Sequence, residues 1–306
     1  MLANVQAILA ATDLSRPAFA AVRRAALLAR AHGAKLELVH VIPDSFRSNA
    51  WQELLISFAQ VEADLRNSIA ETFEALVAQV EAEIGVRANA LVAEGKPFAE
   101  IAARSEAIDA DLIVVGAHGE NFVLTSLLGT TAHRVLRCAR KPVLLVKQTP
   151  SMERAQMPGY DHIVVATDFG EDSLAAARSV QRLFSQSTIT LFHAYQAPFE
   201  AKLSGRVSEE GLKAYRERAF EEAHRELESF AATANLSAAP RVVRHGFPAV
   251  RLREYAEETS ADLIAIGSEE VPRLQNALLG SVSLDVVTQA TCDVLLARSF
   301  ADRLRA

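Results

Sequence analysis

Short apolar runs alternate with longer amphipathic segments along the chain. In the first half the apolar runs cover residues 5–12, 35–41, 87–93, 111–116 and 143–147, and several contain almost no polar residue. Uninterrupted runs of this length suit parallel strands that are covered on both faces. The alternation of strands and helices therefore predicts an α/β fold with a doubly wound parallel sheet.

Helix signals fill the intervals between these runs. Ser15 can cap a helix that continues to about His32, and Pro97 follows Gly95 at a place where a helix can begin without a backbone N–H. A longer helix is predicted over residues 48–83. Its apolar positions at helical spacing are Trp51, Leu54, Leu55, Phe58, Val61, Leu65, Ile69, Phe73, Leu76 and Val80. The charged faces of this helix and of its counterpart over 208–232 are expected to be solvated surface.

The second half of the chain repeats the first. Four pairs of segments carry the repeat: residues 8–14 with 163–169, 110–116 with 261–267, 127–130 with 278–281, and 142–145 with 293–296. A duplication explains all four matches together. We therefore expect two domains, 1–149 and 159–306, joined by the polar segment 148–158, which has a proline near each end.

Charge and composition narrow the classes of partner. The formal net charge is −6 and the two signs are mixed along the chain, whereas a nucleic-acid backbone or an anionic membrane selects for clustered Lys and Arg. No apolar run approaches the length of a membrane span, and the N-terminal segment reads as a strand that enters a helix, not as a signal peptide. The chain has two cysteines, Cys138 and Cys292, which we expect to be reduced thiols in a cytoplasmic protein.

Candidate chemistry gathers after the first and fourth strands. Open α/β sheets bind ligands beyond the carboxyl ends of their strands, where the strand order reverses. Residues 11–13 (ATD) follow the first strand, residues 116–119 (GAHG) follow the fourth, and residues 129–131 (GTT) open a helix that runs to about Ala139. Glycines let backbone N–H groups approach a bulky anion, and a helix N-terminus attracts phosphate. The alternative is that the glycines only form tight turns and Thr130 only caps the helix; the clustering favours a ligand.

These residues resemble the nucleotide-binding motif of the universal stress protein family. The spacing Gly-x2-Gly-x9-Gly-(Ser/Thr) is matched in full by Gly116, Gly119, Gly129 and Thr130, and His40-Val41 and the Gly-x-Pro at residues 95–97 match as well. The resemblance covers nearly all of both halves and is to the two-domain members. It implies a Rossmann-like sheet of order 3-2-1-4-5 in each half, with ATP at the reversal point. Carried over residue by residue, the ATP-binding residues are Ala11, Thr12, Asp13, Val41, Gly116, His118, Gly119, Gly129, Thr130 and Thr131.

The second half departs from the motif. It reads Gly267-Ser268-Glu269-Glu270, with Gly280-Ser281 after nine further residues, so a glutamate replaces the middle glycine. A side chain there blocks close backbone approach, and two carboxylates repel a triphosphate. We therefore expect ATP in the first domain only and a degenerate site in the second, although Asp168 is kept. The first site also departs at Glu120, where the family commonly has a basic residue.

Other chemistries find less support. The chain has no Gly-x-Gly-x-x-Gly after its first strand and no Gly-Lys-(Ser/Thr), which disfavours a nicotinamide cofactor and a P-loop. His118 and His133 could bind zinc or assist hydrolysis, but no further ligands stand at recognisable spacing, and structural roles are favoured. Asp13 could act as a base or hold Mg²⁺ with ATP, yet no second acid or basic clamp completes a phosphoryl-transfer set.

Three classes of function remain open: an ATP-occupied stress-response sensor or regulator, a slow ATPase, and a nucleotide-free scaffold. The first is favoured.

The last strand of each half, 143–147 and 293–297, is apolar and is expected at a sheet edge, where it invites pairing with another strand. In single-domain members of the family this strand pairs across a dimer. The resemblance therefore implies an intramolecular pseudo-dimer in which strands 143–147 and 293–297 meet. A homodimer would then use the outer helices.

Overall fold

The computed structural model of the chain describes residues 4–44, 58–119, 128–147, 159–197, 200, 206, 208–268 and 279–299. The chain divides into two compact units, the first ending at Gly159 and the second beginning at Tyr160. The predicted linker, residues 148–158, lies outside the described residues. The pairing predicted between strands 143–147 and 293–297 stays a prediction.

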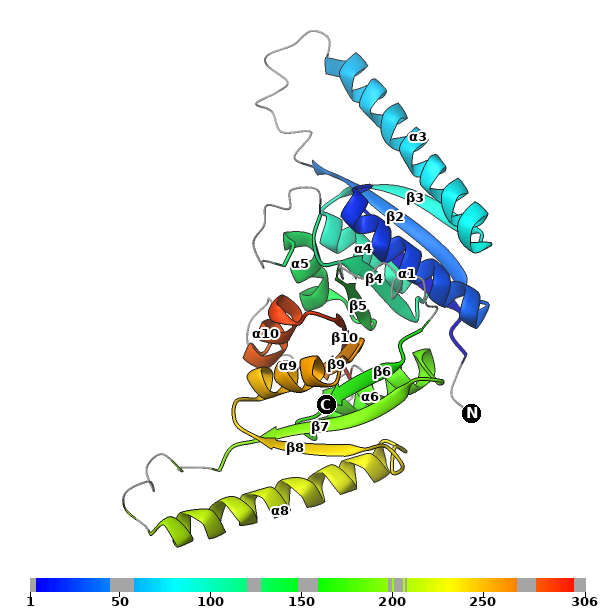
Figure 1. Cartoon of the computed structure of the whole chain (residues 1–306). Coiled ribbons are helices and arrows are strands. Elements are labelled where there is room, and N and C mark those ends of the chain that lie inside the picture. Colours follow the sequence, from blue (N-terminus) through cyan, green and yellow to red (C-terminus); the bar gives the residue numbers. More distant parts are fainter. Residues whose placement is uncertain are drawn as a thin grey trace, which may run out of the picture. The chain divides into compact units, whose positions relative to one another are not determined.

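The first unit alternates strands with helices (Figure 1). In chain order its elements are β1 (Ala7–Ala11), α1 (Arg16–His32), β2 (Lys35–Pro43), α3 (Phe58–Ile84), β3 (Ala88–Gly95), α4 (Pro97–Ala107), β4 (Leu112–Gly116), α5 (Thr130–Cys138) and β5 (Val143–Val146). The strands pair in parallel in the order β3-β2-β1-β4-β5. Because parallel crossovers are right-handed, α1 and α3 cover one face of the sheet while α4 and α5 cover the other. The predicted doubly wound sheet is confirmed.

The second unit repeats this architecture (Figure 1). Its elements are β6 (His162–Ala166), α6 (Glu171–Leu183), β7 (Thr188–Tyr195), α8 (Glu209–Thr233), β8 (Arg241–His245), α9 (Pro248–Glu258), β9 (Leu263–Gly267), α10 (Ser281–Gln289) and β10 (Asp293–Ala297). The strands are again parallel, in the order β8-β7-β6-β9-β10. The duplication read from the sequence is therefore a duplication of the fold.

Local sequence signals set the ends of the elements. The Ser15 hydroxyl accepts a hydrogen bond from the Ala18 N–H and caps α1, and Gly33 ends α1 in the left-handed region with φ 63°. Pro97 begins α4 as predicted. The long helix predicted over 48–83 is described from Phe58 to Ile84, and its predicted first turns lie outside the described residues. The strand residues Ile8, Leu9 and Ala10 are fully buried, as expected for a sheet covered on both faces.

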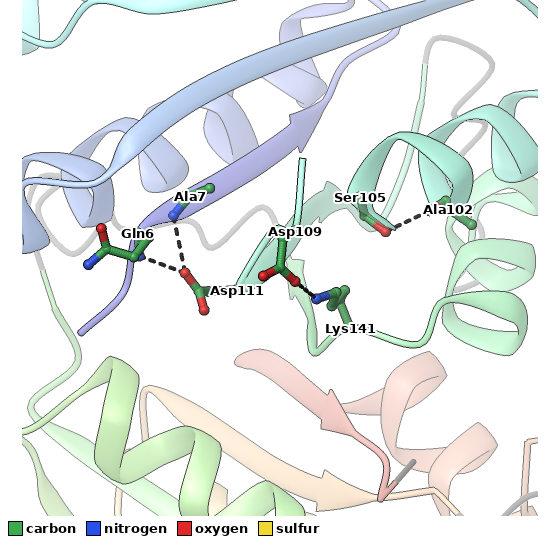
Figure 2. Close-up of polar contacts among 7 residues, drawn as sticks. All are labelled: Gln6, Ala7, Ala102, Ser105, Asp109, Asp111 and Lys141. Carbon is green, nitrogen blue, oxygen red and sulfur yellow. Dashed lines mark hydrogen bonds and ion pairs between the residues drawn. The ribbon is translucent and has the colours of Figure 1, made fainter. Parts of the chain in front are cut away.

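An aspartate fastens the amino end of each sheet. In the first unit Asp111 Oδ2 accepts hydrogen bonds from the Gln6 and Ala7 N–H groups, at 2.6 and 3.1 Å, as Figure 2 shows. In the second unit Asp262 Oδ2 accepts the corresponding pair from Asp161 and His162, both at 3.0 Å. The repeated Ala-Asp-Leu segment therefore has a structural role at the end of the sheet away from the predicted ligand loops.

A half-buried ion pair ties α4 to the sheet of the first unit. Glu37 on β2 is 7% exposed, and its carboxylate accepts two hydrogen bonds from Arg104, at 2.5 Å from Nε and 2.8 Å from Nη2. The hydrogen bond to Glu37 is the main cause that raises the pKa of Arg104. The bidentate geometry makes this pair stronger than an ordinary surface salt bridge.

Arg104→Ala should destabilise the first unit because it leaves the Glu37 carboxylate buried without its cation. Solvent reaches the Arg104 side chain, which is 36% exposed, so we expect a loss of about 2 kcal/mol in the free energy of unfolding, below the cost at a fully buried pair. Urea unfolding measures this loss. Arg87→Ala is the control, since Arg87 also pairs with a glutamate, Glu81, but its side chain is 91% exposed. Equal effects of the two changes would contradict the assignment.

Neither cysteine forms a disulfide; Cys138 is exposed and Cys292 is buried. Within the part of the chain that the structure describes, no helix combines the length and the apolar character needed to cross a membrane.

Candidate functional site

A cavity of about 1020 Å³ opens at the carboxyl ends of β1, β2 and β4 in the first unit. This volume is at the upper end of the range of small-molecule sites, so it can accommodate a nucleotide. All ten residues proposed from the sequence line it: Ala11, Thr12, Asp13, Val41, Gly116, His118, Gly119, Gly129, Thr130 and Thr131. Three segments far apart in the sequence thus converge on one cavity, at the reversal point of the strand order.

The sequence reasoning missed the residues that enclose this cavity from other elements. They come from the β1 loop and the start of α1, the end of β2, one face of α3, and the start of α4: Leu14, Ser15, Ala18, His40, Ile42, Pro43, Leu65, Ser68, Ile69, Thr72, Pro97 and Ile101. The helical periodicity marked Leu65 and Ile69 as apolar positions of α3, but it could not distinguish positions that pack on the sheet from positions that face a cavity.

The loop after β1 holds Asp13 in a fixed orientation. Asp13 Oδ1 accepts hydrogen bonds from the Ser15 N–H at 3.0 Å and from the Ser15 hydroxyl at 2.5 Å. Thr12 Oγ1 accepts a hydrogen bond from the Leu14 N–H at 3.0 Å, and Leu14 adopts a left-handed backbone with φ 64°. These hydrogen bonds fix the orientation of the Asp13 carboxylate before any ligand binds. Less conformational entropy of the side chain is then lost on binding.

A histidine on β2, His40, forms a hydrogen bond with the loop after β1. His40 Nδ1 lies 2.9 Å from the Thr12 carbonyl oxygen. A carbonyl only accepts, so Nδ1 carries the proton in this hydrogen bond. His193 Nδ1 makes the same contact with the Thr167 carbonyl in the second unit, at 2.8 Å. Comparison of the two halves could have identified this pair, because each histidine lies in the second strand of its unit, close to the strand's carboxyl end.

The glycine loop after β4 packs directly on the β1 loop. A Cβ on Gly119 would lie 2.5 Å from Asp13 Oδ2, closer than a real contact permits. A Cβ on Gly129 would lie 3.2 Å from the Ala117 carbonyl oxygen, and the Gly129 N–H donates to that oxygen at 2.8 Å. A side chain at position 119 would therefore have to displace the Asp13 carboxylate, a constraint that the motif alone did not reveal.

The N-terminus of α5 also lines the cavity. Its N-cap residue is Gly129, which provides no side-chain cap, and Thr130, Thr131 and Ala132 of the first turn line the cavity. The first N–H groups of a helix have no partner within the helix, and they carry the positive end of its dipole. This wall can therefore bind an anion, with the threonine hydroxyls as additional donors.

Two histidines near the glycine loop are shifted toward their neutral forms. Burial lowers the pKa of His118, and the nearby positive charge of Lys147 lowers it further. Burial also lowers the pKa of His133, with Arg137 and Arg134 adding to the effect. A neutral His118 can either donate or accept a hydrogen bond at the cavity wall. Among the described residues, no group of three or more His, Cys, Asp or Glu side chains could hold a metal ion.

The loop after β6 in the second unit keeps the backbone of the loop after β1, together with its threonine and its aspartate. Phe169 has φ 68° and its N–H donates to Thr167 Oγ1 at 2.8 Å, while Asp168 Oδ1 accepts from the Gly170 N–H at 3.0 Å. Glu269 and Glu270, on which the prediction of a degenerate second site rested, lie outside the described residues.

The chain is similar to proteins that are about as long as one of its two units. Relatives of one-unit length match about half of it: a universal stress protein of Thermus aquaticus is 34% identical over 144 residues, 46% of this chain and 97% of the relative. One from Methanocaldococcus jannaschii is 28% identical over 145 residues, 45% of this chain and 82% of the relative.

Solved structures of full length share the fold. The crystal structure of a universal stress protein from Archaeoglobus fulgidus covers 95% of this chain and 98% of its own, with a TM-score of 0.63 and 19% identity. A protein of unknown function from Pseudomonas aeruginosa covers 96% of this chain and 92% of its own, with a TM-score of 0.60 and 18% identity. The model of the universal stress protein family matches residues 4–147 and again 159–298. This chain therefore belongs to the universal stress protein family and carries two copies of its domain in tandem.

Proposed function

We propose that this protein binds one ATP per chain, in the cavity of the first unit, and acts as a nucleotide-occupied regulator or sensor in a stress response. The observation that carries the proposal is the convergence of the Asp13 carboxylate and the N-terminus of α5 on one cavity of nucleotide size. A carboxylate suits the hydroxyl groups of a ribose, and a helix N-terminus suits phosphates.

The cavity lining supports an assignment for each part of the nucleotide. Val41 on β2 would meet the adenine edge through its main chain, and the apolar side chains of Ile42 and Ile69 line the same cavity. Asp13 would accept hydrogen bonds from the ribose. Gly119, Gly129, Thr130 and Thr131 would hold the phosphates through N–H and hydroxyl groups.

Retention of the nucleotide fits this lining better than rapid hydrolysis. Among the described lining residues, Asp13 is the only carboxylate and there is no lysine or arginine. Fast phosphoryl transfer usually relies on cationic groups and a positioned base around the γ-phosphate. We therefore assign regulation by occupancy, with at most slow turnover.

Isothermal titration of the full chain with ATP, with and without Mg²⁺, tests this proposal. We expect one site per chain. Asp13→Ala should weaken binding by roughly 10- to 100-fold, the value of a hydrogen bond to a charged group. Asp168→Ala, the matched change in the second unit, should leave the affinity unchanged. A stoichiometry of two would contradict the assignment to one unit, and an absence of binding would refute the proposal as a whole.

A further inference from the structure

Both units have an aspartate after the first strand, Asp13 and Asp168, and the residue that follows it differs between them although the backbone is the same. Leu14 and Phe169 both adopt the left-handed region, with φ 64° and 68°. In each case the backbone N–H donates to the threonine hydroxyl two residues earlier, at 3.0 Å from Leu14 to Thr12 and 2.8 Å from Phe169 to Thr167. With the backbone matched, the two side chains leave the chain at equivalent places.

These side chains have different surroundings. Leu14 and His40 both line the cavity of the first unit, and the His40 ring has the Phe73 ring as a distant neighbour, at 6.4 Å between centroids. In the second unit the Phe169 ring lies 4.3 Å from the His193 ring, with an angle of 31° between their planes. The Phe169 ring also lies 6.2 Å from the Phe230 ring of α8, in an edge-to-face arrangement. An aromatic ring thus fills the space between the end of β7 and α8.

Two further positions of the cavity lining differ between the units. Ala18 and Ala132 line the cavity of the first unit, and serines hold the matching positions in the second, Ser173 and Ser283. Both serines are buried, at 2% and 7% exposure. Ser173 Oγ lies 2.9 Å from Thr167 Oγ1, and the Ser283 hydroxyl donates to the Gly267 carbonyl at 3.0 Å. These hydroxyl groups hydrogen-bond within the unit, where the first unit has alanines beside a cavity.

We propose that Phe169 closes the nucleoside end of the second unit, and that the difference between Leu14 and Phe169 decides which unit accepts a nucleoside. The inference rests on the proposed ATP site of the first unit. The Phe169 ring, which packs against the His193 ring at 4.3 Å between centroids, occupies the volume that an adenosine would need between the strand end and the long helix. Closure by Phe169 acts on the nucleoside itself, independently of any repulsion that Glu269 and Glu270 exert on phosphates.

Exchanging the two side chains tests the proposal. Leu14→Phe should weaken ATP binding to the first unit by about tenfold or more, because the larger ring would take space in the cavity that the nucleoside needs. Phe169→Leu should raise the number of adenosine molecules bound per chain from one to two. Adenosine is the probe for the second unit because it lacks the phosphates that the two glutamates would repel. Both variants are measured as full chains by calorimetry, and Phe247→Leu, at an aromatic residue that is 72% exposed in the second unit, is the control.

The outcomes separate the two claims. Failure of the unaltered chain to bind ATP or adenosine would refute the proposed function. ATP bound by the unaltered chain and with equal affinity by the Leu14→Phe variant would refute the closure alone. If Leu14→Phe does not fold, the Phe169→Leu variant decides: a second adenosine supports closure by Phe169, and a single adenosine in a folded Phe169→Leu chain overturns it.

Discussion

Gly119→Glu should abolish ATP binding by the first unit. Even a methyl group at this position would lie 2.5 Å from Asp13 Oδ2, so any side chain must displace the carboxylate. Asp13 cannot move without cost, because its Oδ1 accepts two hydrogen bonds from Ser15. Glutamate also adds a negative charge beside both Asp13 and the proposed phosphate sites, where like charges repel strongly. This change gives the first motif the glutamate that Glu270 supplies in the second.

The expected loss exceeds 100-fold in affinity, since removal of a hydrogen bond to the ligand and addition of a like charge each cost about 2 kcal/mol. Calorimetry on the full chain measures it. Gly280→Ala is the control, because Gly280 holds the position of Gly129 in the second unit and its added Cβ would meet no atom of the described residues within 4 Å. Circular dichroism of the variant verifies the fold. Wild-type affinity in a folded Gly119→Glu protein would show that the glycine loop does not hold the ligand.

The sheet of each unit could be predicted from the sequence because the signals for its strands are local and occur in both halves of the chain. Apolar runs of five or more residues identify buried parallel strands, and the repeat supplies a second, independent copy of each signal. The strand order came from the family resemblance, and the pairing of β1 with both β2 and β4 confirms its centre. Ser15 and Pro97, which begin two of the helices, are signals of the same local kind.

Several residues that line the cavity could not be predicted from the sequence. Asp13, Gly119 and Thr130 stand in a recognisable motif, but Leu65 and Ile69 reach the cavity only through the packing of α3 against the sheet. Nothing in a helical pattern distinguishes such positions from ordinary core. The reason for Gly119 was equally hidden, because it depends on a carboxylate more than 100 residues earlier in the chain.

Gly267 provides the clearest case of one motif position with two physical roles. It corresponds to Gly116 of the first motif, where an added Cβ would find its nearest neighbour, the His118 carbonyl oxygen, at 3.4 Å. On Gly267 the same atom would lie 2.4 Å from the Asp172 carbonyl carbon and 2.4 Å from the Ser173 nitrogen. The backbone of α6 therefore packs directly on the end of β9, and neither partner is a flexible side chain.

Gly267→Ala should strongly destabilise the second unit. The backbone of α6 must retreat to admit the methyl group, and such overpacking costs typically 1–3 kcal/mol, with rigid backbone partners placing this site at about 3 kcal/mol or more. For a unit of this size, that loss lowers the melting temperature by roughly 10 °C. Differential scanning calorimetry of the full chain measures the shift.

The matched change is Gly116→Ala, whose added Cβ makes only ordinary van der Waals contacts. It should lower the melting temperature of the first unit by no more than about 2 °C, because neither overpacking nor a left-handed backbone opposes it. The contrast between two alanines at the same motif position isolates the packing of α6 on β9. Equal shifts in melting temperature for both variants would contradict this packing. Gly267 would then be only a remnant of the nucleotide-binding motif, with no packing role of its own.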